Sequence, residues 1–112
     1  MTARFEINAR NDDKFGFVLK SANGQVILVS QGYTTKAACQ AGIQSVRAHA
    51  SVASSFSSLA AKNGSPYFTM MARNGQVIGQ SQMYGTTTAR DNGIRAVMTS
   101  APLATVVDNT RP

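Results

Sequence analysis

Residues 17–46, FVLKSANGQVILVSQGYTTKAACQAGIQSV, recur as residues 68–97, FTMMARNGQVIGQSQMYGTTTARDNGIRAV, without a gap and at a constant offset of 51 residues. Fourteen of the 30 aligned positions are identical, whereas average composition gives roughly two identities by chance. The chain is therefore a tandem duplication. A single copy would bury too little apolar surface to be stable alone. We expect one domain, 1–112, built from two repeats of about 1–54 and 55–112.

Each copy contains the pattern of a β-hairpin. In the first copy, apolar residues at 15, 17 and 19 alternate with other residues, which is the period of a strand with one buried face. Asn23-Gly24 separates this strand from a second one at 25–30. An Asn-Gly pair between two strands predicts a type I′ turn, which requires positive φ at both central residues. Asn74-Gly75 repeats the arrangement in the second copy.

Further strands are predicted outside the two hairpins, at 4–8, 56–60 and 103–108. Polar turns at 11–14 and 62–65 return the first two of these strands into the hairpins. The Ala- and Ser-rich joint around Phe56 has the composition of a flexible linker. We interpret it as a strand, because Phe56 occupies the repeat position of Phe5 and gives the segment an aromatic side chain to bury.

A helix is predicted after each hairpin. Apolar or small residues recur at helical spacing at 39, 42, 43, 46 and 50, and again at 90, 93, 94, 97 and 101. Thr34 or Thr35 is expected to cap the first helix, and Thr86 the second. Gly42 and Gly93 lie mid-helix, where glycine costs about 1 kcal/mol relative to alanine. This repeated cost predicts a close contact between each helix and the sheet.

Composition indicates an ordinary globular domain. The chain is 43% hydrophobic and 14% charged, which argues against a disordered protein. No apolar run reaches the roughly 18 residues that a membrane span needs, and residues 1–14 lack the apolar stretch of a signal peptide. Cys39 is the only cysteine, so no intrachain disulfide can form. We expect a cytoplasmic protein with no membrane partner.

No pattern in the sequence points to catalysis, a cofactor or a metal. His49 is the only histidine, which excludes a histidine pair on a metal within one chain. Cys39 is in phase with the apolar helix positions, and Arg90 occupies its position in the second repeat, so the fold does not require a thiol there. The carboxylates are dispersed over turns, caps and chain ends: Glu6, Asp12, Asp13, Asp91 and Asp108. We expect no enzymatic activity and no cofactor.

Two classes of binding function stay open. The net charge of +6 favours a small basic module that binds nucleic acid or another polyanion. Its candidate anion-binding residues are Lys20, Lys36, Arg47, Arg73, Arg90 and Arg95. Tyr33 and Tyr84 precede the helices at equivalent positions, where they either stack on bases or pack on the sheet.

The alternative is a protein-interaction or structural module that acts through sheet edges or the helix-free face of the sheet. The partner is left open between nucleic acid and an acidic protein. The chain itself is expected to be a monomer, as an internal pseudo-dimer, or a weak homodimer.

Short strings in both repeats carry a family resemblance. GFVLK at 16–20, NGQVI at 23–27 and YTTKAA at 33–38 resemble the YegP-like family of small bacterial proteins, as do IGQSQMY at 78–84 and VDNT at 107–110. The resemblance implies an α+β fold of two β-β-β-α-β units in a single antiparallel sheet. Two helices would pack on one face, and the C-terminal strands would be exchanged between repeats. It implies no function, catalytic residue or binding residue.

Overall fold

Two repeats of three strands and a helix, followed by one more strand, make up the fold. The computed structural model describes residues 2–10 and 12–110. The first repeat contains β1 (Arg4–Ala9), β2 (Phe15–Lys20), β3 (Val26–Ser30) and α1 (Lys36–His49). The second contains β4 (Phe56–Ala60), β5 (Pro66–Met71), β6 (Val77–Gln80) and α2 (Thr87–Ser100), and β7 (Thr105–Asp108) ends the chain. Short 3-10 turns, η1 (Ala53–Ser55) and η2 (Ala101–Leu103), lead into β4 and β7.

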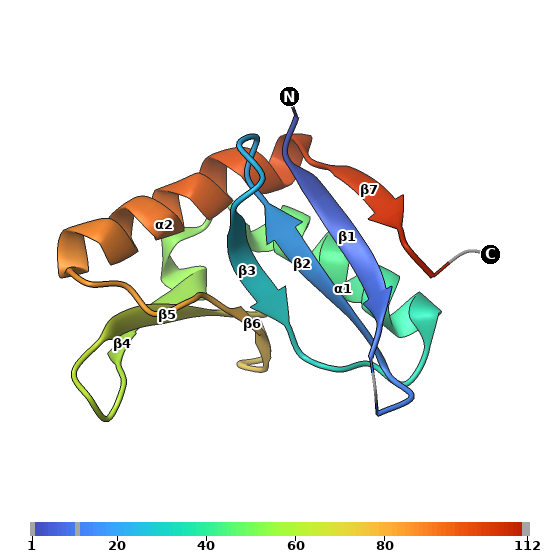
Figure 1. Cartoon of the computed structure of the whole chain (residues 1–112), viewed down its shortest axis with the longest axis horizontal. Helices are drawn as coiled ribbons and strands as arrows, with labels where there is room; N and C mark the ends of the chain where they lie inside the picture. Colours follow the sequence, from blue (N-terminus) through green and yellow to red (C-terminus); the bar gives the residue numbers. More distant parts are fainter. Residues whose placement is uncertain (1, 11, 111–112) are drawn as a thin grey trace.

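The strands form one seven-stranded sheet in the order β4-β5-β6-β3-β2-β1-β7. The repeats meet in the middle, where β3 and β6 pair antiparallel, and β4 and β7 lie at opposite edges (Figure 1). The prediction of a single antiparallel sheet is wrong at one edge, because β7 runs parallel to β1. No hairpin joins β7 to β1: the chain leaves β6, passes along α2 and returns in the direction opposite to β6, which is the direction of β1.

The exchange of C-terminal strands runs in one direction. β7 of the second repeat pairs with β1 of the first, with Phe5 opposite Val106 and Ile7 opposite Asp108. The second repeat receives no strand in return: within the described part of the chain, β4 ends the sheet order. The first repeat is therefore a β-β-β-α unit, and only the second is followed by a fourth strand.

Both helices cover the same face of the sheet. The ring of Phe17 in β2 lies 3.1 Å from the position of a Cβ at Gly42 of α1, and Phe68 in β5 lies 3.2 Å from that of Gly93 of α2. The strand registers from β2 through β3 and β6 to β5 place both rings on one face. α1 also reaches β6, and α2 reaches β3. The two repeats thus share one core.

The Asn-Gly turns differ from their predicted type. In the first hairpin only Gly24 has positive φ, at +87°, so the turn is not type I′. Gly24 N donates to Ser21 O at 2.8 Å, and Ser21 N donates to Gln25 O at 2.9 Å. This is a type I turn closed by a left-handed glycine. The Asn23 carboxamide accepts from Gln25 N at 3.1 Å and holds this arrangement.

The same turn geometry recurs at the other hairpins. Gly75 and Gly64 have φ of +85° and +86°. Of the predicted turn at 11–14, Asn11 lies outside the described residues, and Asp13 occupies the position of Gly64 with φ of +62°. A non-glycine residue in this region carries a steric cost.

The helix caps follow the repeat. Thr35, and not Thr34, caps α1: its Oγ1 accepts from Ala38 N at 3.0 Å, and Thr86 caps α2 in the same way. The buried residues are Cys39, Gly42, Ile43 and Val46 in α1, and Gly93 and Val97 in α2.

Across the described ranges 2–10 and 12–110, no helix combines the length and the apolar character needed to traverse a bilayer.

Candidate functional site

Both lysines among the predicted anion-binding residues are paired with carboxylates of the chain itself. Lys20 Nζ lies 3.1 Å from Glu6 Oε1, and Lys36 Nζ lies 3.0 Å from Asp108 Oδ2. Hydrogen bonds from Thr110, together with Lys36, lower the pKa of Asp108 to about 2. The carboxylate of Asp108 is therefore ionised at neutral pH, and it neutralises Lys36 at the outer edge of the sheet.

Arg47 on α1 anchors the segment that leads into β7. Its Nη2 donates to the carbonyl of Ala104, and its guanidinium lies 5.5 Å from the ring centroid of Phe5. A cation over an aromatic face is a favourable contact in its own right. Arg47 thus ties the end of the second repeat to the first.

The remaining candidate cations lie apart from one another. Arg73 is exposed in the β5–β6 turn. On α2, Arg90 Nε lies 3.2 Å from Asp91 Oδ1, and Arg95 Nη1 donates to a neighbouring asparagine at 2.9 Å. Lys20 alternates with the buried Leu19 and so projects from the face opposite the helices. The structure does not gather the six cations on one face, and anion binding by them stays a prediction.

The two tyrosines pack against the sheet. Tyr33 stacks on Phe17 with ring centroids 6.3 Å apart, and Tyr84 stacks on Phe68 with centroids 6.4 Å apart. A Cβ at Gly42 would stand 2.3 Å from Tyr33 Oη, and the second repeat has the same arrangement. The glycines predicted to permit close packing therefore make room for the tyrosine hydroxyls. One face of each ring is occupied, and base stacking stays a prediction.

The candidate reactive groups are enclosed or engaged. Cys39 is fully buried, and burial together with the nearby Asp108 raises the pKa of its thiol to about 11. A ring nitrogen of His49, Nδ1, lies 2.8 Å from Ser45 O. Within residues 2–10 and 12–110, no group of three or more His, Cys, Asp or Glu side chains is placed to hold a metal.

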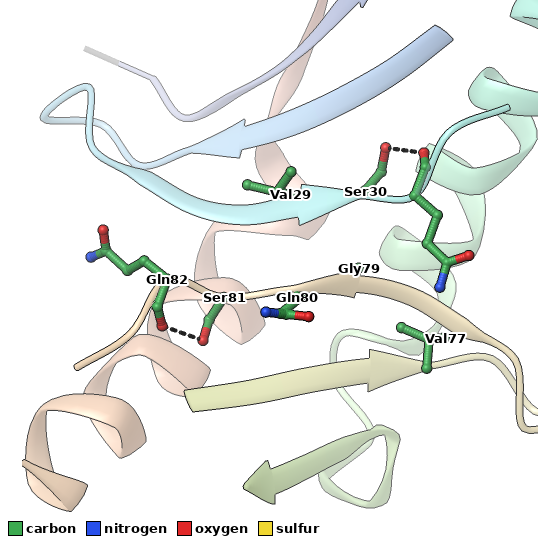
Figure 2. A pocket seen from close by; sticks show the side chains of 8 residues that line it. Val29, Ser30, Val77, Gly79, Gln80, Ser81 and Gln82 are labelled. Atoms are coloured by element: carbon green, nitrogen blue, oxygen red, sulfur yellow. Dashed lines mark hydrogen bonds between the residues drawn. The ribbon is translucent and has the colours of Figure 1, made fainter. Parts of the chain in front are cut away.

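A pocket of about 360 Å³ lies on the seam where β3 meets β6 (Figure 2). Val29, Val77 and Gln80 line it with exposed, neutral side chains. Ser30 and Ser81 line it too, but each hydroxyl donates to the carbonyl of the next residue at 2.8 Å and accepts a buried backbone N–H. The described lining residues include no titratable side chain. The seam pocket offers contact surface, not acid–base chemistry.

The outer side of the second repeat is bare where that of the first is covered. Equivalent residues in the centre of the sheet are buried alike, as Phe17 and Phe68 are at 1% and 0% exposure. Three equivalent pairs at the outer side differ: Phe5 (0%) and half-buried Phe56, Ile7 (0%) and exposed Ser58, Ile43 (1%) and half-buried Ile94. We call the bare side, formed by β4 with Arg90 and Ile94 of α2, the β4 rim.

β7 accounts for this difference. Thr105 N donates to Ala3 O at 3.1 Å, and Asn109 N donates to Ile7 O at 2.9 Å, so alternate residues at the β1 edge turn their carbonyls toward β7. Ser58 corresponds to Ile7 in the repeat and has the same register, opposite Phe68 as Ile7 is opposite Phe17. The N–H and carbonyl of Ser58 therefore face away from β5, at an edge with no neighbouring strand among the described residues.

Comparison with known proteins identifies the family. A family model described as a domain of unknown function, DUF1508, matches residues 11–56 and 61–108. This chain belongs to the UPF0339/YegP family. A UPF0339 protein of Shewanella oneidensis is 44% identical over 110 residues, which cover 98% of this chain and 100% of that protein. The UPF0339 protein YegP of Shigella flexneri is 43% identical over 110 residues, with the same coverage.

Solved structures of UPF0339 proteins share the fold. The solution NMR structure of the Shewanella oneidensis protein has a TM-score of 0.90, 44% identity, and covers 96% of this chain and 92% of that chain. That of YegP from Escherichia coli has a TM-score of 0.92, 41% identity, and covers 97% and 94%. The resemblance seen in the sequence is confirmed. The function of the family is unknown, and neither an enzymatic activity nor a binding target is named for it.

Sequence reasoning missed the β4 rim of this UPF0339 member, although the repeat contains the signal. The offset of 51 residues maps β7, Thr105–Asp108, onto residues 54–57. These residues already belong to η1 and β4. The same residues cannot form the last strand of the first repeat and the first strand of the second, so one edge of the sheet stays open.

Proposed function

We propose that the protein is a protein-interaction module that accepts an extended segment of a partner along the outer edge of β4. The carrying observation is that the equivalent edge, on β1, is occupied by β7. An open strand edge presents unpaired N–H and carbonyl groups that an incoming strand can pair with. Adding a strand to such an edge is a recurrent way of recognising peptides.

The surroundings of β4 support this function over polyanion binding. Half-buried Phe56 and Ile94 flank the edge and offer apolar surface to an added strand. Lys36 pairs with Asp108, Lys20 shares the Glu6 carboxylate with a neighbouring arginine, and Arg47 donates to the carbonyl just before β7. Polyanion binding depends on several cations that act on neighbouring phosphates, and the candidates lie on different elements and faces.

The module acts by binding alone and not as an enzyme. Its single thiol is enclosed, the serine hydroxyls of the seam are engaged in hydrogen bonds, and the seam pocket has a neutral lining. Catalysis needs an acid, base or nucleophile that can reach a bound substrate. Partner recognition at an edge needs only backbone groups and surface complementarity.

A peptide with the sequence of residues 103–110, LATVVDNT, tests the proposal on the full-length protein labelled with ¹⁵N. We expect amide shifts in Ser57–Ala60 of β4 and near Ile94. Methylating the peptide nitrogen of Val107 should abolish binding, because that N–H faces the edge in the β7 pairing pattern. Methylating the nitrogen of Val106 is the matched control, since it points the other way.

A protein variant provides the second arm. Ser58→Pro removes the outward N–H, and proline is tolerated at sheet edges; it should abolish binding, while Ser58→Ala should bind normally. The methylated peptides keep the test valid if the proline variant fails to fold. Shifts confined to β1, or no shifts at millimolar peptide, would refute a strand-accepting β4 edge.

A further inference from the structure

We infer, on the basis of the proposed function, that the accepted segment runs parallel to β4 and carries a carboxylate that pairs with Arg90. The partner is therefore a protein with an extended acidic segment, in which an apolar residue is followed two positions later by Asp or Glu. β7 on β1 provides an internal template for this arrangement, because the two repeats have the same strand and helix geometry.

The template fixes what each position of the segment meets. Val106 of β7 pairs with Phe5 and lines one pocket together with Ile43 of α1. Asp108 pairs with Ile7 two positions later and reaches Lys36, at 3.0 Å. An apolar side chain thus covers the helix, and an acid two residues on meets a cation at the start of the same helix.

The repeat transfers these positions to the β4 rim. Phe5 and Ile43 correspond to Phe56 and Ile94, which are half-buried, and in the described part of the chain no strand lies beyond β4 to cover them. Lys36 corresponds to Thr87, so the cation of the first repeat is lost there. Cys39, which is close enough to Asp108 for the carboxylate to raise its pKa, corresponds to Arg90.

Arg90 therefore supplies a positive charge on α2 one helical turn after the position that Lys36 occupies on α1. Positions three residues apart lie on the same side of a helix, and Arg90 stands one turn after Thr87. Its side chain is 17% exposed. Its contact with the exposed Asp91, at 3.2 Å, joins adjacent residues at the surface, and such pairs contribute little. A carboxylate on an incoming strand can replace it.

Arg95 and the role of β7 within the chain indicate which kind of segment pairs with β4. Arg95 corresponds to Gln44 and Asp91 to Gln40, which both line the pocket next to Val106, so the rim has two arginines and one aspartate where the equivalent positions of α1 have only Lys36. The β7 strand of a second copy is a poor donor, because its departure would uncover Phe5 and Ile7, which are fully buried. A segment of another, acidic protein fits better.

The test compares the LATVVDNT peptide with the same peptide carrying Asp108→Asn, on wild type and on Arg90→Gln. We expect the asparagine peptide to bind wild type about fivefold more weakly, as for a partly exposed ion pair. On Arg90→Gln the two peptides should bind alike. Arg73→Gln is the matched control, because it removes one charge at the β5–β6 turn and should preserve the preference for aspartate.

The orientation of the bound peptide is measured from the broadening of β4 amide signals by a nitroxide attached to either end of the peptide. A parallel strand places the N-terminal label near Phe56 and the C-terminal label near Ala60, and the reverse pattern of broadening would overturn the inference. Equal binding of both peptides at β4 in wild type would also overturn it while leaving the strand-accepting function intact. Absence of binding at β4 would remove both, and dimerisation through β4 would replace the acidic partner by a second copy.

Discussion

Replacing Gly42 by alanine sets two effects of opposite sign against each other. Alanine stabilises the middle of a helix by about 1 kcal/mol relative to glycine, so helix propensity predicts a more stable protein. The structure predicts the reverse, because the new Cβ would lie 2.3 Å from Tyr33 Oη and 2.8 Å from Tyr33 Cζ. The ring is stacked on Phe17, and the Tyr33 backbone is held by two hydrogen bonds of 2.7 Å to Phe15.

The steric effect is the larger of the two. Forcing an extra carbon into a filled site costs about 1 to 3 kcal/mol, and two contacts below 3.0 Å place Gly42→Ala near the upper value. Subtracting about 1 kcal/mol of helix propensity leaves a loss of about 2 kcal/mol in the free energy of unfolding. For a domain of this size the thermal midpoint should fall by about 8 °C.

Urea denaturation followed by circular dichroism measures the effect in Gly42→Ala, Tyr33→Phe and the double variant. Removing the hydroxyl relieves the shortest contact, so the double variant should regain about 1 kcal/mol relative to the sum of the single variants. Ala41→Gly, at an exposed neighbouring position of α1, isolates helix propensity and should lose about 1 kcal/mol. If Gly42→Ala is as stable as wild type while Ala41→Gly loses stability, the packing argument is wrong.

Three further predictions concern β7, the thiol and a turn. The folded-state pKa of Asp108 lies below its ordinary value of 3.8, so its stabilising effect is present above about pH 4 and lost as the pH falls toward 2; the thermal midpoint should drop more in wild type than in Asp108→Asn. Cys39 should resist a disulfide reagent at pH 8 in the native protein and react once guanidinium unfolds it, because it is buried with a pKa of about 11. Gly64→Ala should lose about 1 kcal/mol in urea denaturation, because its φ is +86°.

Local patterns in the sequence predicted the elements well. The segments with period-2 spacing are strands in the structure, the two segments with helical spacing are helices, and Thr35 and Thr86 cap these helices. The turn type was missed because Asn23 stabilises a type I turn through its side chain, and that hydrogen bond competes with the left-handed conformation of a type I′ turn. The Asn-Gly dipeptide alone does not distinguish the two.

Contacts between distant parts of the chain were beyond the sequence pattern. The parallel pairing of β7 depends on α2 carrying the chain back across the sheet, which no local period encodes. The cations could be named but not placed, because the partners of Lys36 and Arg47 come from the far end of the chain, 57 residues away in the case of Arg47. The β4 rim was detectable from the repeat offset alone, because the offset assigns residues 54–57 both to the last strand of the first repeat and to the start of the second repeat.

The open edge follows from the length of the joint between the repeats, and that makes it testable by insertion. Two separate β-β-β-α-β units would each keep a fourth strand, and mutual exchange of these strands would close both edges. Fusion at an offset of 51 residues uses residues 54–57 for η1 and β4, so the first repeat has no strand left to give.

Inserting a copy of residues 103–110 and a return linker after Val52 should restore that strand. A four-residue strand spans about 13 Å, so about eight Gly and Ser residues allow the chain to turn back into β4. The inserted strand should slow hydrogen exchange of the Ser58 amide, raise the thermal midpoint and block binding of the LATVVDNT peptide. An insertion of equal length made only of Gly and Ser is the control. Unchanged exchange at Ser58 would mean that the two repeats do not present equivalent edges, and the internal template would lose its basis.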